Sequence, residues 1–454
     1  MKKFDAAVIG YGKGSKNLVP SLASAGMKVA FIEKSDRMYG GTCPNVGCVP
    51  TKFLVNRSEL AEVKGFADFD EKAAWYAQSI KDKKALREMI LGKMYGAATN
   101  ISGAEFFHAA ASFVSARELH LEGPGVDENI TADRIIIDTG SYPFVPPING
   151  INESKRVYTS EGMLDLEELP RRLVIIGGGN IGLEFASFYR RFGSDVIILQ
   201  DLADFMPAED EDVAKCVRES MEERGIKMEF GVKVLSVKDG PNGTTVTYSV
   251  NGEERSADGD AVLVSTGRRP FTRGLNLDAA GVAITPRGFI AVDERLRTSV
   301  PNVWAMGDVA GSPQFTYISL DDSRVILSDI NGGSRTTDRL VPYSVFLSPS
   351  LSRVGLTEKA ALAAGHRVKT AVLSPKSIPR CHTLGKYTGM LKATVDAETG
   401  AILGVSLFCE ESHEMINTVK LAMDCKLPYT ALRDTIFTHP VMTEALNDLF
   451  AMIK

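Results

Sequence analysis

Two cysteines, Cys43 and Cys48, lie five positions apart in the segment GGTCPNVGCVPTK. Thiols at this spacing, between glycines and near an expected helix start, can close a small disulfide ring, and the positive helix end favours the thiolate once the pair is reduced. The pattern is typical of a disulfide that opens and recloses. No metal site is expected, because the other cysteines lack paired Cys or His spacing, and we predict that they are packed residues: Cys216, Cys381, Cys409 and Cys425.

Two segments, which start with FDAAVIG and RRLVIIG and have their first turn glycines at Gly10 and Gly177, share one plan of strand, glycine-rich turn, helix and second strand. Their strands are short continuous apolar runs, as expected in a parallel sheet covered on both faces. The second segment has the full G-x-G-x-x-G pattern at Gly177, Gly179 and Gly182. Such a turn brings backbone N–H groups and a helix N-terminus to a pyrophosphate, so we predict a dinucleotide site there.

The first turn reads Gly10, Gly12 and Gly14, with Ser15 in place of the third glycine of the pattern. The next strand closes with Glu33, which is placed to accept hydrogen bonds from a ribose diol. We therefore predict a second dinucleotide site.

The strand after the second turn ends in Gln200, where NAD-binding proteins usually carry an acid, and Asp201 follows. No arginine stands there to meet a 2′-phosphate. These residues favour NADH over NADPH.

The chain of 454 residues suggests about three domains, and its net charge of −5 and 44% hydrophobic content are ordinary for a globular enzyme. This composition disfavours disorder, a disulfide scaffold and binding driven by overall basicity. No apolar run approaches the ~20 residues of a membrane span, and the N-terminus lacks the pattern of a signal peptide. We expect a soluble cytoplasmic protein without nucleic-acid or membrane partners.

The sequence character changes beyond about residue 336, where alternating segments such as GMLKATVD and AILGVSLF precede helical ones. The predicted fold is α/β, with two doubly wound dinucleotide-binding domains and a C-terminal α+β domain. The acidic run AEDEDVAK, residues 208–215, is interpreted as a solvated helix start.

Seven motifs occur in an order that covers essentially the whole chain: GYGKGS with Glu33, GGTCPNVGCVPTK, DTGSYP, GGGNIGLEFA, STGRRP, TSVPNVWAMGDVAG and FTHPVMTE. In these motifs the sequence resembles the class I flavin-dependent pyridine nucleotide-disulfide oxidoreductases, which include dihydrolipoyl dehydrogenase, glutathione reductase and mercuric reductase. The resemblance implies an FAD domain at 1–145 and 271–335, an NAD(P) domain at 146–270 and a dimerisation domain at 336–454.

The resemblance also implies roles for single residues. Cys48 would lie against the isoalloxazine of FAD as the charge-transfer thiolate, and Cys43 would attack the substrate. Lys52 would pair with Glu184 near the flavin and nicotinamide. Asp308 would bind the ribityl chain, and the remaining cofactor contacts would come from Gly41, Thr42, Lys52, Thr139, Gly140, Gly267 and Arg268.

His439 and Glu444 lie in the last motif. In the family this histidine reaches the cysteine site of the other subunit as acid and base, and the glutamate orients its ring. Histidine suits the role because it exchanges protons near neutral pH. The resemblance therefore implies a homodimer with a shared active site.

The oxidant is less well defined by these motifs. The chain ends in NDLFAMIK without a vicinal cysteine pair, which disfavours mercuric reductase. Dihydrolipoyl dehydrogenases usually carry His-x-His-Pro, whereas this chain has Phe437-Thr438-His439-Pro440. The C-terminal stretch from SIPRCHTLGKYTG onward most resembles a bacterial subgroup associated with reactive chlorine stress, whose members reduce hypothiocyanous acid. We expect NAD(P)H-dependent reduction of that small oxidant. A dihydrolipoyl dehydrogenase-like disulfide reductase, a flavin enzyme without a thiol step and a redox-sensing or metal-handling flavoprotein remain alternatives.

Overall fold

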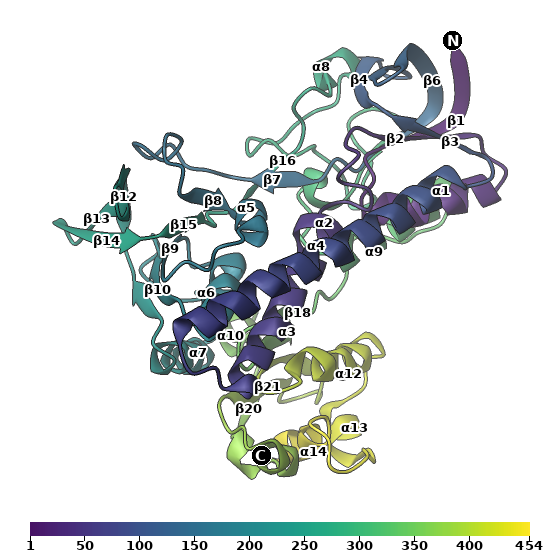
Figure 1. Ribbon diagram of the computed structural model, residues 1–454. Coiled ribbons are helices and arrows are strands. Elements are labelled where there is room, and N and C mark those ends of the chain that lie inside the picture. The colour runs from purple at the N-terminus through teal and green to yellow at the C-terminus, as the bar shows by residue number, and fades with distance from the viewer.

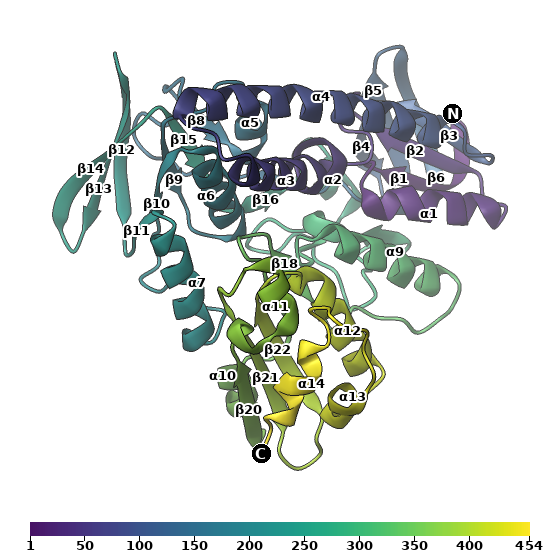
Figure 2. The ribbon, with the colours of Figure 1, turned by 60° about the horizontal axis from the view of Figure 1, so that its bottom comes forward.

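The computed structural model describes residues 1–454, in which the two strand–turn–helix segments form the parallel cores of two separate sheets. The first sheet has the strand order β3-β2-β1-β6-β5-β4, with β17 beside β6. It is parallel except at β5 and β4, which pair antiparallel with β6 and with each other. Its strands are β1 (Lys2–Ile9), β2 (Val29–Glu33), β3 (Ala104–His108), β4 (Ala110–Ser115), β5 (Glu118–Gly123), β6 (Val126–Ile137) and β17 (Val303–Ala305). The helical elements of this region are α1 (Lys13–Ser24), α8 (Leu277–Ala280), η1 (Gly307–Ala310) and α9 (Thr316–Ile330). Helices α1 and α9 lie side by side (Figures 1 and 2).

The second parallel sheet has the order β11-β10-β9-β15-β8. Its strands are β8 (Val157–Thr159), β9 (Arg172–Ile176), β10 (Asp195–Leu199), β11 (Lys227–Glu229) and β15 (Ala261–Val264). The helices between them are α5 (Ser160–Asp165), α6 (Asn180–Phe192) and α7 (Glu211–Glu223). A three-stranded antiparallel sheet extends from this region and comprises β12 (Lys233–Gly240), β13 (Gly243–Val250) and β14 (Glu253–Gly259).

The chain passes between the two regions along one short antiparallel pair, β7 (Ser141–Pro143) with β16 (Arg268–Pro270). These strands carry the DTGSYP and STGRRP motifs. The pairing places both crossings side by side, between the two parallel sheets (Figure 1).

The C-terminal region is an antiparallel sheet with the order β18-β19-β22-β21-β20. Its strands are β18 (Tyr343–Val345), β19 (Leu351–Gly355), β20 (Val368–Leu373), β21 (Met390–Asp396) and β22 (Ile402–Phe408). The helical elements are α10 (Glu358–Ala363), η2 (Pro375–Ser377), α11 (Pro379–Leu384), α12 (Ser412–Asp424), α13 (Tyr429–Asp434) and α14 (Ala445–Ala451). The predicted fold class is confirmed.

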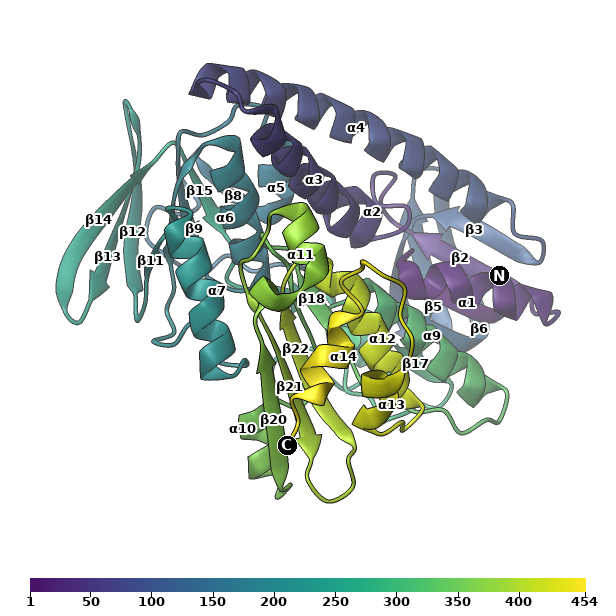
Figure 3. The same ribbon diagram turned by 90° about the horizontal axis from the view of Figure 1, so that it is seen from below.

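Three helices connect the regions: α2 (Thr42–Val46) and α3 (Cys48–Lys64), which carry Cys43 and Cys48, and α4 (Phe69–Thr99). Helix α4 has 31 residues and runs along both parallel sheets (Figures 2 and 3). Near its start, Asp70 pairs with Arg171 of the second region, and near its end the Met94 carbonyl accepts from the Tyr11 hydroxyl of the first. The cysteine helices are thereby held between the two dinucleotide folds.

Two interpretations from the sequence are corrected here. The acidic run begins helix α7 as predicted, with Glu211 and Asp212 exposed, but Glu209 and Asp210 are buried and not solvated. Asp210 lies 3.3 Å from the Lys392 ammonium of β21, so this part is an interdomain contact. Cys381 and Cys409 are buried as predicted, whereas Cys425 is exposed and Cys216 is half-buried. No helix has the length and apolar character needed to cross a membrane.

Candidate functional site

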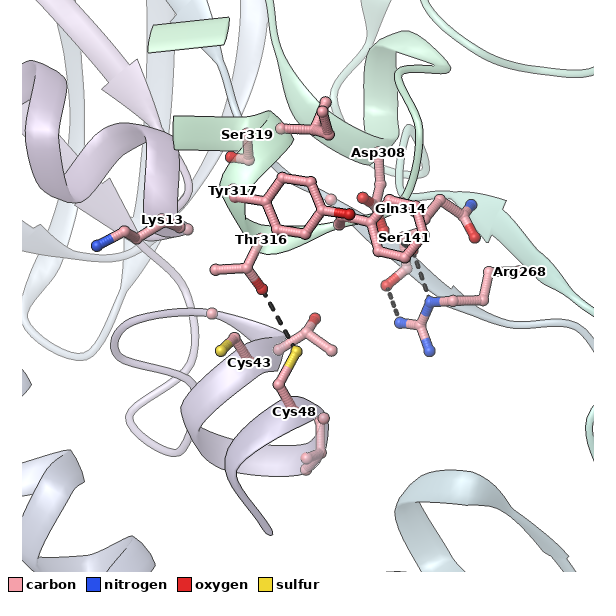
Figure 4. Close-up of a pocket in the computed structure, with 18 of the residues that line it drawn as sticks. Lys13, Cys43, Cys48, Ser141, Arg268, Asp308, Gln314, Thr316, Tyr317 and Ser319 are labelled. Atoms are coloured by element: carbon pink, nitrogen blue, oxygen red, sulfur yellow. Dashed lines mark hydrogen bonds between the residues drawn. The ribbon is translucent and has the colours of Figure 1, made fainter. Parts of the chain in front are cut away.

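The two cysteines lie at the start of two successive helices, α2 and α3, and α3 runs from its start near the first sheet away from that sheet (Figure 3). Cys43 is on α2, and Cys48 begins α3 directly after Gly47. Both are free thiols, and the Cys48 Sγ lies 3.4 Å from the Thr316 hydroxyl at the start of α9 (Figure 4). The pair therefore sits where three helix N-termini converge.

The electrostatics of the pair are unequal. A hydrogen bond from Cys43 lowers the pKa of Cys48, and the Thr316 hydroxyl and the Lys52 charge lower it further, against the effect of burial. The same hydrogen bond, together with burial, raises the pKa of Cys43. Cys48 is thus the thiol that carries negative charge in the reduced pair, which is the property expected of a stored thiolate.

Lys52 and Glu184 form an ion pair with 2.5 Å between Nζ and Oε2. Lys52 lies one turn beyond Cys48 on α3, and Glu184 comes from α6 of the second region. The other oxygen of Glu184 accepts the backbone N–H of Phe346 at 3.0 Å, and the Lys52 ammonium lies 4.3 Å from the Phe346 ring centroid. The ion pair therefore joins the cysteine helix, the second region and the C-terminal region.

At the first glycine-rich turn, Glu33 is buried and its two oxygens accept the backbone N–H groups of Tyr11 at 2.8 Å and Ser35 at 2.9 Å. Burial raises the pKa of Glu33 in spite of these bonds. Ser15, which replaces the third glycine, donates its hydroxyl to Asp138 Oδ2 at 2.7 Å and its N–H to the same oxygen at 3.0 Å. The serine is thus one half of a buried pair and not a defect of the motif.

The first turn fits a dinucleotide pyrophosphate. The backbone N–H groups of Gly12 and Lys13, which open α1, have no acceptor in the protein. Across from them, a Cβ on Gly41 would lie 3.0 Å from the Gly12 Cα, so two glycines leave a narrow cradle that any side chain would fill. A cradle of unpaired N–H groups at a helix start is a site for phosphate.

Farther along the cavity, the Ser141 hydroxyl donates to Asp308 at 2.5 Å and accepts from Arg268 Nε at 2.8 Å (Figure 4). The Thr139 hydroxyl donates to the Phe271 carbonyl at 2.7 Å. Burial raises the pKa of Asp308. This short chain of polar groups fixes the direction of the Asp308 carboxyl within the cavity wall.

The second turn has the same geometry with different residues. Gln200 Oε1 accepts the Gly178 N–H at 2.6 Å, as Glu33 does from Tyr11. A Cβ on Gly182 would lie 2.1 Å from the Gly177 carbonyl oxygen, so this position requires glycine. Gln200 is therefore tied to the turn, and its remaining amide N–H groups are the donors available there.

One continuous cavity of about 1930 Å³ joins both turns and the cysteine pair. Its wall includes most residues predicted to act: Gly10, Gly12, Glu33, Gly41, Thr42, Cys43, Cys48, Lys52, Thr139, Gly140, Gly177, Gly179, Glu184, Gln200, Gly267, Arg268 and Asp308. Gly14, Ser15 and Gly182 lie behind the wall, in the packing of α1 and α6.

His439 and Glu444 do not line this cavity. Glu444 accepts from His439 Nδ1 at 2.8 Å, and the imidazole is 66% exposed on the surface of the C-terminal region. Within one chain, the structure therefore leaves the oriented histidine apart from the cysteines.

The sequence analysis missed several residues of the site. Asp138 is buried beneath the first turn, Thr316 and Ser319 bring hydroxyls from α9, and Phe346 and His413 line the cavity from the C-terminal region. Asp138 could have been found, since its carboxyl follows a buried strand in DTGSYP, at the edge where parallel strands present ligands. The others depend on contacts between distant segments.

Comparison with known proteins adds two findings. The profile of the family described as pyridine nucleotide-disulphide oxidoreductase matches residues 4–323, and that of the corresponding dimerisation domain matches residues 341–450.

Among solved structures, the chain is similar to the Cu(II) complex of HOCl-induced flavoprotein disulfide reductase RclA from Escherichia coli, with a TM-score of 0.93, 42% identity and 100% of both chains covered. It is 34% identical to a dihydrolipoyl dehydrogenase of Thermus scotoductus, over 99% of this chain and 97% of the relative. It is 32% identical to a mercuric reductase of Staphylococcus aureus, over 98% of this chain and 81% of the relative.

Proposed function

Because this chain belongs to the pyridine nucleotide-disulphide oxidoreductase family, we propose that it passes electrons from NAD(P)H through FAD and the Cys43–Cys48 disulfide to hypothiocyanous acid. The observation that carries the proposal is the single cavity that joins both dinucleotide turns and both cysteines. FAD would occupy the first turn and NADH the second. When bound, FAD supplies two-electron transfer between the nicotinamide and the sulfur pair.

The proposed division of the chain assigns FAD to 1–145 and 271–335, the nicotinamide coenzyme to 146–270 and the dimer contact to 336–454. The β7–β16 pair, at which both crossings run together, supports the first two boundaries. The match of residues 341–450 to a dimerisation domain supports the third. We place the reaction in the cytoplasm.

The residues divide the thiol chemistry between them. The Cys43 thiol gives its proton to His439 of the partner subunit and attacks the electrophilic sulfur of hypothiocyanous acid, displacing hydroxide, which takes that proton and leaves as water. Cys48, whose pKa is lowered by the Cys43 hydrogen bond, then attacks the Cys43 sulfur, re-forms the disulfide and releases thiocyanate. His439 of the partner subunit would supply the proton, with its Nδ1 held by Glu444.

The choice of hypothiocyanous acid as the substrate rests on sequence comparison and not on the shape of the cavity. The relative with 42% identity over the whole chain is described as HOCl-induced, and Phe437 stands where the lipoamide enzymes have the first histidine of His-x-His-Pro. Oxidised lipoamide remains the second candidate, because a dihydrolipoyl dehydrogenase is 34% identical.

Anaerobic titration with NADH, followed by a panel of oxidants, tests the proposal. We expect the flavin to be reduced by NADH and reoxidised by hypothiocyanous acid at least about a hundredfold faster than by oxidised lipoamide, glutathione disulfide or Cu(II). Faster reoxidation by oxidised lipoamide or Cu(II) would overturn the substrate assignment and favour the lipoamide or metal-handling alternative.

Two variants test the thiol step itself. Cys43→Ser removes the attacking thiol and should abolish reduction of hypothiocyanous acid, whereas Cys425→Ser, which changes an exposed cysteine far along the chain, should retain it. Full activity of Cys43→Ser would favour a flavin enzyme without a thiol step. His439→Gln should lose turnover, while a redox sensor would keep its response.

A further inference from the structure

His413 is a histidine of the main cavity to which the resemblance gives no role. It is the second residue of α12, half-buried, and it lines the cavity. Its ring centroid lies 5.2 Å from that of Phe346. Since Phe346 also contacts Lys52 and donates its N–H to Glu184, the imidazole is separated from that ion pair by one aromatic ring.

A chain of serine hydroxyls holds this imidazole. Ser350 Oγ lies 3.0 Å from His413 Nδ1 and 2.8 Å from Ser412 Oγ. Ser352 Oγ lies 3.0 Å from Ser412 and 2.8 Å from Ser344, which lines the cavity again. Ser350, Ser352 and Ser412 are buried, so water does not complete their bonding.

Counting protons shows which group donates and which accepts in each hydrogen bond of this serine series. A hydroxyl carries one proton, and Ser412 gives its own to the Ser350 carbonyl oxygen at 2.7 Å. Ser412 must therefore accept from both Ser350 and Ser352. Ser350 has then used its proton and can only accept from His413.

The count fixes the tautomer of the imidazole. Nδ1 of His413 carries a proton, and Nε2, which has no hydrogen-bond partner in the protein, is the basic nitrogen of the neutral ring. His439 is held in the same way, by an acceptor at Nδ1, but on the exposed surface. The chain thus has two oriented histidines, one outside its own cavity and one within it.

Resting on the proposed function, we infer that His413 carries the proton that enters with each hydride, taking it up at Nε2 beside the Lys52–Glu184 pair and releasing it for Cys43. The electron and proton balance of disulfide reduction requires a group that carries this proton to a cysteine. A hydride brings two electrons and one proton; the electrons break the sulfur–sulfur bond into two sulfur anions, and the proton makes one of them a thiol. NAD(P)H and the disulfide thus give NAD(P)⁺, one thiol and one thiolate.

No other titratable group competes for the ring. The elements packed against α12 bring Tyr343 from β18, Arg353 from β19, and Tyr429, Arg433 and Asp434 from α13, while β22 brings none. Across Phe346 stand Lys52 and Glu184, and Glu414 is the neighbour on the helix itself. None of these is hydrogen bonded to the imidazole, whose one protein partner is Ser350.

Rapid mixing of the oxidised holoenzyme with NADH under anaerobic conditions tests the role. His413→Gln should slow formation of the thiol–thiolate pair by about a hundredfold, the size of a general acid–base effect. In the wild type this rate should fall toward acidic pH, where an imidazole is already protonated, and in His413→Gln it should be flat. His382→Gln, which changes an exposed histidine that meets the Tyr387 ring edge to face, is the matched control and should leave the rate unchanged.

A second measurement does not depend on turnover. Nitrogen-15 spectra of histidine-labelled protein distinguish the tautomers of the six imidazoles, and His413→Gln identifies the signal. We expect the Nδ1–H form in the wild type and a mixture of tautomers in Ser350→Ala, which removes the acceptor. An Nε2–H form in the wild type would overturn the inference.

The two experiments separate this inference from the proposed function. If NADH and NADPH both fail to open the disulfide of the wild type, the proposed electron path is wrong. If the wild type is reduced and His413→Gln is reduced at the same rate and with the same pH profile, only the role of His413 is wrong.

Discussion

The two glycine-rich turns of this chain follow the same backbone path but place different side chains beneath it. In each, the first glycine lies against the end of a third strand, at Asp138 in the first turn and at Ser265 in the second. The first turn places Ser15 against the Asp138 carboxyl, and the second places Gly182 beneath the Ser265 hydroxyl. The equivalent pair is thus serine with a buried acid in one turn and glycine with serine in the other.

The two turns also differ in how closely other parts of the chain cover them. The first turn is covered by α9, whose Ser319 hydroxyl accepts the Gly14 N–H at 3.0 Å, and Gly41 closes over Gly12. At the second turn nothing lies within 4 Å of where a Cβ on Gly179 would be. An enclosed turn suits a group that stays bound, and an open one suits a coenzyme that leaves in each cycle.

Exchanging the middle glycine of each turn for alanine should give the largest difference. A Cβ on Gly12 would lie 2.6 Å from Asp138 Oδ2, a buried atom already held by Ser15. We expect Gly12→Ala to be purified without FAD, as judged from the flavin absorbance. Gly179→Ala should retain FAD and show a raised KM for NADH. Equal flavin content in the two variants would remove the contrast between the turns.

Asp138 should give the first turn a pH dependence that the second lacks. Burial raises the pKa of Asp138 to about 7, above the ordinary ~4 of an aspartate. Between these values the folded chain binds more protons than the unfolded one, so this carboxyl lowers stability as pH rises, by up to about 4 kcal/mol above pH 7.

Urea unfolding at pH 5 and pH 8 checks this expectation. Asp138→Asn removes the titration, so the loss of stability between the two pH values should be smaller in this variant than in the wild type. Ser265→Ala, at the equivalent place in the second turn, has no titrating group to remove and should keep the wild-type difference. A parallel loss in all three proteins would show that Asp138 does not titrate in this range.

The contrast between the turns also marks what the sequence could predict. Both turns, the strands that precede them and the cysteine helices follow from local patterns of glycine and apolar residues, and the fold class is confirmed. The replacement of a glycine by Ser15 was visible in the sequence, but its reason was not, because Asp138 lies 123 positions away.

Burial of charge was the least predictable property for the same reason. Asp210 was interpreted as solvated, yet it accepts N–H groups at the start of α10 and pairs with Lys392, on a strand far along the chain. Helix α4 was not anticipated either, because its role is to touch both parallel sheets and its sequence shows no single apolar face.

Exchanging Glu33 and Gln200, the residues at the two strand ends, should have smaller effects. Glu33→Gln loses one of the two N–H bonds made by the buried carboxylate, and the affinity for FAD should fall by about 2 kcal/mol, or roughly thirtyfold. Gln200→Glu introduces a charge beside the second turn that repels a 2′-phosphate, and the ratio of kcat/KM for NADH over NADPH should rise about tenfold. Fluorescence titration with FAD and steady-state assays with both coenzymes measure the two effects. An unchanged coenzyme ratio would place the ribose away from Gln200.

Ser15→Gly converts the first turn to the glycine pattern of the second and should have the smallest effect. The glycine removes one hydroxyl bond to Asp138 and keeps the backbone one, at a cost of about 1 kcal/mol. The pH dependence of this loss of stability distinguishes the removal of a hydrogen bond from a change in the packing of the turn. The hydroxyl stabilises the charged carboxylate more than the neutral acid, so the urea midpoint should fall further at pH 8 than at pH 5. If the midpoint fell equally at both pH values, the serine would act by packing alone, and the buried acid would need another explanation for its place beneath the turn.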